Sequence, residues 1–309
     1  MDYIYLVIGF LLLIKGSDIL VEGASSVAKK FGISALVIGL TIVAFGSSAP
    51  ELVINLISGF TGKTELAVSN ILGSNISNIF LILGITAIIS PITLPKSTVM
   101  KEIPFLIFVS GLLALLLSDG MITTFDAIIL SFFFILFLGY TFHIAKNGED
   151  SEDDIKILHN TKATLYIIGG LAGLIIGGKL IVDSAVSIAG AFGLTDAFIG
   201  VTVIAIGTSL PELAVSVIAA LKKQTDMAVG AIVGSNIFNT LWILGATGFL
   251  AELPAYTGIK IDLGVNIIAS LLIFLFAFTM RKHLLDRSEG VILLLAYCTY
   301  IGYLISTVI

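Results

Sequence analysis

Long apolar stretches alternate with short polar connections along almost the whole chain. An α-helix needs about 20 apolar residues to cross roughly 30 Å of hydrocarbon at 1.5 Å per residue. The pattern predicts an all-α polytopic membrane protein with ten transmembrane helices. We place them at residues 3–26, 35–62, 66–90, 101–118, 123–145, 163–190, 196–222, 226–250, 263–281 and 289–308.

One extended polar segment, residues 146–162, interrupts this pattern near the middle of the chain. We interpret it as a cytoplasmic linker between a first five-helix repeat at 1–145 and a second at 163–309. A charge run in a connection is usually a solvated loop, so we favour that interpretation over calcium sensing. The run consists of Glu149, Asp150, Glu152, Asp153 and Asp154.

The two halves repeat each other at an offset of 161 residues, which places Gly177 on Gly16 and Gly245 on Gly84. Each half has five predicted spans, an odd number, so the second copy must enter the membrane from the opposite side. Such inverted repeats are typical of secondary transporters, whose binding site lies at the repeat interface near the midplane. The identities gather in two motifs: Ala44, Gly46, Ser48, Pro50, Glu51 and Leu52 with their partners from Ala205 to Leu213, and Gly73 to Asn78 with Gly234 to Asn239.

Composition supports lipid as the main solvent. Hydrophobic residues make up 57% of the chain and charged residues 12%, and the mean hydropathy is +1.11. A soluble domain of this size is far less apolar. The single cysteine, Cys298, excludes an internal disulfide and argues against zinc, haem and redox motifs. Nothing in the sequence indicates nucleic acid or an obligatory protein partner.

Basic residues are distributed unevenly between alternate connections. Two basic residues, Lys63 and Lys260, fall in the connections on one face of the membrane, and the connections on the opposite face carry many more. Because cytoplasmic loops retain lysine and arginine, we predict a multi-pass protein of the cell (inner) membrane with both termini outside. The residues on the cytoplasmic face are Lys29, Lys30, Lys96, Lys101, Lys146, Lys156, Lys162, Lys222, Lys223, Arg281, Lys282 and Arg287.

The first motif puts a proline halfway along the second and seventh predicted spans. Proline lacks an N–H and clashes with the carbonyl one turn back, so each helix should break there. Carbonyls freed at membrane depth are tolerated only around a cavity or an ion. We expect this of the carbonyls of Ala44, Ser47, Ala205 and Thr208.

A glutamate follows each of these prolines, Glu51 in the first half and Glu212 in the second. A charge at this depth costs a few kcal/mol or more unless it is compensated. A packing kink with a protonated glutamate is the alternative explanation. A kink gives no reason for both copies to keep the acid, so a bound cation is the simpler one.

The second motif adds hydroxyl and amide groups. Ser74 and Asn78 share a helical face, as do Ser235 and Asn239, because each pair is four residues apart. Ordinary helix packing of small residues is the alternative. With the glutamates, the set consists of hard oxygen donors that suit Ca2+ or Na+, not zinc or copper. One Ca2+ or two Na+ would neutralise two carboxylates, and such mutually exclusive occupancy is what coupled exchange requires.

At these residues the chain resembles the sodium/calcium exchangers of the calcium/cation antiporter superfamily, of the prokaryotic type without a large regulatory loop. Their two repeats carry G-S/T-S-x-P-E/D and a downstream G-S-x-x-x-N/D, and the resemblance covers almost the whole chain. It implies a secondary active transporter that exchanges Na+ for Ca2+ by alternating access, with the first and sixth helices sliding across the other eight.

The resemblance also implies a division of the site, with Ca2+ and Na+ as transported ions. Glu51 and Glu212 would bind Ca2+ together with the carbonyls of Ser47 and Thr208. The sodium sites would be completed by Ser48, Ser74, Asn78, Ser209, Ser235 and Asn239, and by the carbonyls of Ala44 and Ala205.

Two other couplings are open. Potassium-dependent relatives place aspartate where this chain has Asn239, and proton-coupled relatives carry a G-N-x-x-E motif that is absent here. Both differences favour sodium coupling. An intramembrane enzyme would need a nucleophile or a metal motif such as His-Glu-x-x-His, and the sequence has none. We therefore do not expect the protein to be an enzyme.

Charged residues on the first and sixth helices form a weaker case. The spacing of Lys15, Asp18 and Glu22, and of Lys179 and Asp183, favours local ion pairs over a transport role. The histidines, at positions 143, 159 and 283, fall at span ends or in loops and are not candidates for the site.

Overall fold

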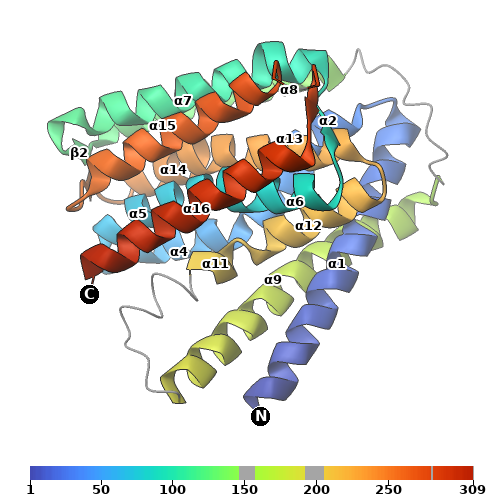
Figure 1. The fold of residues 1–309 in the computed structure, drawn as a ribbon, viewed down its shortest axis with the longest axis horizontal. Helices are drawn as coiled ribbons and strands as arrows, with labels where there is room; N and C mark the ends of the chain where they lie inside the picture. Colours follow the sequence, from blue (N-terminus) through green and yellow to red (C-terminus); the bar gives the residue numbers. More distant parts are fainter. Residues whose placement is uncertain (146–156, 192–204, 280, 309) are drawn as a thin grey trace.

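A computed structural model describes residues 1–145, 157–191, 205–279 and 281–308, and these are helical nearly throughout (Figure 1). In the first half the elements are α1 (Asp2–Phe31), α2 (Ala35–Ile38), η1 (Gly39–Val43), α3 (Ala44–Ser47), α4 (Ala49–Thr61), α5 (Thr64–Ser77), η2 (Asn78–Leu83), α6 (Gly84–Ile89), β1 (Ile92–Thr93), η3 (Thr98–Glu102), α7 (Ile103–Leu116), η4 (Leu117–Asp119), β2 (Met121–Ile122) and α8 (Thr124–Ala145). In the second half they are α9 (Asn160–Ala191), α11 (Ala205–Thr208), α12 (Leu210–Leu221), α13 (Thr225–Ile237), η6 (Phe238–Ile243), α14 (Leu244–Gly248), β3 (Leu253–Pro254), α15 (Ile259–Phe276), β4 (Leu284–Leu285) and α16 (Arg287–Val308).

The described residues form eight helices long and apolar enough to cross a membrane, or nine if the bent pair Ala35–Ser47 and Ala49–Thr61 is one span. This confirms a multi-pass, all-α membrane protein. The seventh predicted span, 196–222, is seen from Ala205 onward, and its earlier part lies outside the described residues, as does the acidic run 149–154. The count of ten therefore stays a prediction.

Several helix boundaries differ from the expected ones, and α1, for example, continues to Phe31 where an end at residue 26 was predicted. α9 begins at Asn160, inside the segment assigned to the linker. α15 spans Ile259–Phe276, earlier than the predicted 263–281. The chain leaves α15 early because it turns at His283, whose φ is 61° and whose N–H donates to the carbonyl of Ala277 at 2.8 Å. That turn leads into β4.

Several contacts occur twice, with the halves exchanged. β1 pairs with β4, and β2 pairs with β3, both antiparallel. Tyr140 donates to Glu102 and Tyr300 donates to Asp262, and in both pairs the residues are 38 positions apart. A third acid–tyrosine contact joins Tyr256 to Asp262, and burial together with that carboxylate raises the pKa of Tyr256. The duplicated contacts support the inverted repeat.

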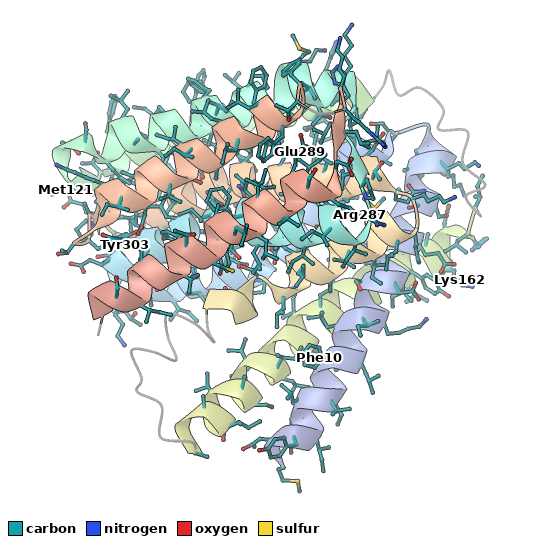
Figure 2. All side chains as sticks on the ribbon, viewed as in Figure 1. Phe10, Met121, Lys162, Arg287, Glu289 and Tyr303 are labelled. Atoms are coloured by element: carbon teal, nitrogen blue, oxygen red, sulfur yellow. The ribbon has the colours of Figure 1, made fainter. Side chains whose placement is uncertain are left out.

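The helices pack around two hydrophobic cores. The larger core draws no buried residue from α1 or α9, and the smaller one joins α1 and α9 to α12 and α13. α1 and α9 run side by side along one flank of the bundle (Figure 1). Apolar side chains such as Phe10, which is 43% exposed, project from the outer helix surfaces as a lipid-facing chain requires (Figure 2).

Glycines allow α1 and α9 to approach closely. A Cβ on Gly16 would lie 2.9 Å from the carbonyl oxygen of Gly170, and one on Gly177 would lie 2.8 Å from that of Gly9. Small residues of this kind let membrane helices pack backbone to backbone. The pair α1 and α9 therefore forms a tight unit beside the rest of the bundle.

We predict that Gly16→Ala lowers the thermal unfolding temperature of the detergent-solubilised protein, because overpacking costs about 1–3 kcal/mol when the obstacle is backbone. Gly169→Ala is the matched control, since its nearest neighbour would be the Ile19 Cδ1 at 3.7 Å. Equal unfolding temperatures for the two variants would contradict the close packing of α1 on α9.

Candidate functional site

The two proline motifs break their helices at equivalent serines. α3 ends at Ser47 and α4 begins at Ala49, and the segments on either side differ in direction by 48°. α11 and α12 meet in the same way at Ser209, whose backbone angles (φ −87°, ψ 1°) match those of Ser48 (φ −82°, ψ 9°). Proline is tolerated because it stands in the first turn of the new helix, where an N–H would have no intrahelical partner.

The carbonyl of Ala44 does not lose its intrahelical partner, and that expectation was wrong. It accepts from the Ser48 N–H at 3.1 Å, because the chain leaves the helix only at Ser48 itself. The hydroxyls of Ser47 and Ser235 also reach this oxygen, at 3.3 and 3.5 Å. A carbonyl has two lone pairs, so the Ala44 oxygen could bind an ion only if the hydroxyl donors turned away, and its role as a ligand stays a prediction.

The two glutamates lie close together inside the bundle. Glu51 on α4 is 1% exposed and Glu212 on α12 is 3% exposed. Their carboxylates are near enough to repel each other electrostatically. Ser74 donates to Oε1 of Glu51 at 3.3 Å, and Ser48 donates to Oε1 of Glu212 at the same distance. Thus a serine of the first half contacts the acid of the second.

Each glutamate also presents an oxygen without a hydrogen bond. Oε2 of Glu51 and Oε2 of Glu212 are buried and lack a hydrogen-bond partner among the described residues. The same holds for Oδ1 of Asn78, Oδ1 of Asn239 and the hydroxyl of Ser209. Buried acceptors are normally satisfied, so these oxygens are available to a positive partner.

The remaining predicted residues lie on α3, α11 and α13. The hydroxyls of Ser47 and Ser235 are 3.4 Å apart, which joins α3 to α13. Thr208 is buried on α11, and Ala205 is the first residue of that helix. Side-chain hydrogen bonds thus link Ser48 to Glu212, Ser74 to Glu51 and Ser47 to Ser235. Thr208 and Ala205 lie on α11, which leads into the second helix break at Ser209.

Sequence reasoning gave no role to three asparagines near the site. Asn75 accepts a hydrogen bond from the side-chain amide of Asn239, and Asn236 accepts one from the side-chain amide of Asn78. Asn55 donates to the carbonyl of Glu51 at 2.8 Å. The recurrence of Asn75 as Asn236 in the second repeat was a signal that could have identified this pair.

The donor set suits a hard cation. Among the described residues no group of three or more His, Cys, Asp or Glu side chains could hold a metal, so the pair of carboxylates must act with neutral oxygens. Two buried carboxylates and several amide, hydroxyl and carbonyl oxygens are what Ca2+ and Na+ prefer. Two buried negative charges would be strongly unfavourable without such an ion.

A shallow depression beside Ser48 has no space for a water molecule. Its lining consists of Phe45, Ser48, Leu52, Phe238, Trp242 and Ile243.

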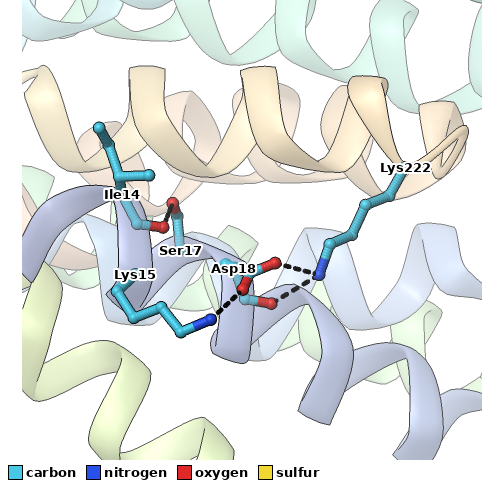
Figure 3. A network of polar contacts seen from close by, with 5 residues as sticks. All are labelled: Ile14, Lys15, Ser17, Asp18 and Lys222. Carbon is cyan, nitrogen blue, oxygen red and sulfur yellow. Dashed lines mark hydrogen bonds and ion pairs between the residues drawn. The ribbon is translucent and has the colours of Figure 1, made fainter. Parts of the chain in front are cut away.

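The ion pairs on α1 are partly as expected (Figure 3). Lys15 pairs with Asp18 at 2.8 Å, as the spacing predicts. Asp18 also pairs with Lys222, at the end of α12, at 2.6 Å, and no local pattern could indicate a partner 204 residues away. Lys179 and Asp183 are exposed and form no ion pair within the described part of the chain, so the expectation of a local pair was wrong there.

Comparison with known proteins identifies the family to which this architecture belongs. The family model described as sodium/calcium exchanger protein matches residues 1–143 and 162–306. The chain belongs to this family. This exchanger is 40% identical over 309 residues to the putative antiporter CaxA of Alkalimonas amylolytica, with 96% of each chain covered. It is 28% identical to the sodium/calcium exchanger MaX1 of Methanosarcina acetivorans, with 97% of each chain covered.

The solved structures agree with the family assignment. A structure of the sodium-calcium exchanger NCX_Mj, soaked with zero Na+ and Ca2+, superposes on this exchanger with a TM-score of 0.86. The two sequences are 34% identical, and 98% of each chain is covered. The predicted resemblance to prokaryotic-type exchangers is confirmed.

If the two carboxylates form a cation site, Ca2+ should raise the unfolding temperature of this exchanger. A ligand that binds only the folded state stabilises it by about 2.7 kcal/mol at a hundred times its Kd. We predict that Glu51→Gln and Glu212→Gln each abolish the shift. Glu102→Gln, which alters another buried acid, should keep it, and loss of the shift in all three variants would contradict the assignment.

Proposed function

We propose that this exchanger is a secondary active transporter that moves Na+ and Ca2+ in opposite directions by alternating access at a mid-membrane site. The observation that carries the proposal is the pair Glu51 and Glu212, one from each half, buried together with unpartnered oxygens. One Ca2+ or two Na+ would balance their charge. Because the same carboxylates serve both ions, one load must leave before the other binds.

We assign the ligands by chemistry and by motif. Glu51 and Glu212 bind Ca2+ with the carbonyls of Ser47 and Thr208. Sodium uses the same acids and adds the neutral oxygens around them. Those residues are Ser48, Ser74, Asn78, Ser209, Ser235 and Asn239, with the carbonyls of Ala44 and Ala205.

Alternating access needs a part that moves as a unit. The pair α1 and α9 is the natural one, because its close glycine contacts hold it together and the larger core excludes it. Movement of this pair relative to α12 would open the site to one side and then to the other. The ion pair between Asp18 and Lys222 would break or form during that movement.

The central test is Ca2+ flux in proteoliposomes. Vesicles loaded with Na+ and diluted into Na+-free buffer should take up Ca2+ while a protonophore keeps the pH gradient at zero. Glu212→Gln should reduce Ca2+ uptake to the level of protein-free vesicles, and Glu102→Gln should still transport Ca2+. Uptake that requires a pH gradient and ignores Na+ would replace sodium coupling with proton coupling.

The sidedness of the chain is a separate part of the proposal. With both termini outside, the loop at Lys63 faces outward and the loop at Lys223 faces the cytoplasm; both side chains are exposed. In a Cys298→Ser background, an impermeant maleimide applied to intact cells should label Lys63→Cys and not Lys223→Cys. The reverse pattern would invert the predicted topology.

A further inference from the structure

We propose that Asn75 and Asn236 are positioning residues, and that each one orients the ion-facing asparagine supplied by the opposite repeat. The inference rests on the proposed function. It assigns part of the exchanger's selectivity for cations to two side chains that do not contact the ion. It starts from four buried asparagines that meet where α5 and α13 pass into η2 and η6.

The contacts cross between the halves in a reciprocal way. Asn78 donates through Nδ2 to Oδ1 of Asn236 at 2.8 Å, over a separation of 158 residues. Asn239 donates through Nδ2 to Oδ1 of Asn75 at 3.1 Å, over 164 residues. At the 161-residue offset that relates the halves, Asn75 corresponds to Asn236 and Asn78 to Asn239. The same contact is therefore made twice.

The two orienting asparagines are themselves fixed. Asn236 donates through Nδ2 to the backbone carbonyl of Asn75 at 3.1 Å. Asn75 donates through Nδ2 to the hydroxyl of Thr240 at 2.9 Å. An amide has donors on one side and an acceptor on the other, so these bonds turn Oδ1 of both residues toward Asn78 and Asn239.

The consequence falls on the candidate ligands. With Nδ2 engaged, Oδ1 of Asn78 and Oδ1 of Asn239 are left buried and without a hydrogen-bond partner among the described residues. A cation attracts these oxygens and would repel the amide nitrogens. If an orienting asparagine were lost, the ligand amide could rotate and turn its N–H groups toward the ion.

The experiment compares one substitution in two backgrounds. We expect Asn75→Ala to weaken Na+ and Ca2+ binding about ten- to a hundredfold, the usual cost of losing a residue that orients a ligand. In an Asn239→Asp background the same substitution should change affinity by no more than about twofold. The reason is that a carboxylate presents an oxygen in either orientation. Affinities are measured on purified monodisperse protein by isothermal titration with NaCl or CaCl2.

A second pair repeats the test if Asn75→Ala does not fold. Asn236→Ala should weaken binding in the native background and have little effect in an Asn78→Asp background. Ser270→Ala is the matched control. It removes a buried hydroxyl whose partners are Ser110 and the carbonyl of Asn266, and it should leave affinity unchanged.

The outcomes distinguish failure of the positioning role from failure of the proposed function. Equal losses in both backgrounds, or losses matched by Ser270→Ala, would show a merely structural role and overturn the inference. Unchanged affinity in Asn75→Ala and Asn236→Ala would also overturn it. Wild-type protein that binds neither Na+ nor Ca2+ would instead overturn the proposed function, and the inference with it.

Discussion

The structure depends on one electrostatic constraint, which is that two carboxylates are buried side by side at membrane depth. Removing each charge from water costs several kcal/mol even after relaxation, and placing them together adds repulsion. Hydrogen bonds from Ser48 and Ser74 satisfy one oxygen of each acid, which leaves Oε2 of Glu51 and of Glu212 unpartnered. In the proposed mechanism a cation at this place would remove the penalty, and its charge would have to match that of the two carboxylates.

The fold provides this site by using one design twice. Each half contributes a helix broken at a serine, an acid one turn beyond, and a helix with serine and asparagine on one face. The halves are joined at the candidate site, through Ser48 with Glu212 and through the exchanged asparagine contacts, and again at the helix ends through the pairs β1 with β4 and β2 with β3. Several contacts that join the two halves therefore also surround the candidate site.

Much of this could be predicted from local pattern. Apolar length predicts most of the helices, and the recurrence of Pro50 and Glu51 as Pro211 and Glu212 predicts the breaks and the acids, because proline and buried charge act on their own segment. Contacts between distant segments could not be predicted. The ion pair of Asp18 with Lys222 and the contact of Asn78 with Asn236 depend on how helices pack. The carbonyl of Ala44 keeps its partner because Pro50 removes the N–H that would bond the carbonyl of Gly46, four residues earlier, and leaves the N–H of Ser48 intact.

The most direct measurement is an experimental structure with Ca2+ bound, in which anomalous scattering locates the ion. The account predicts one Ca2+ coordinated by both Glu51 and Glu212, and its displacement from that position by saturating Na+. Carboxylates that lie apart with no ion between them at saturating Ca2+, or a transported ion bound elsewhere in the helices, would contradict it.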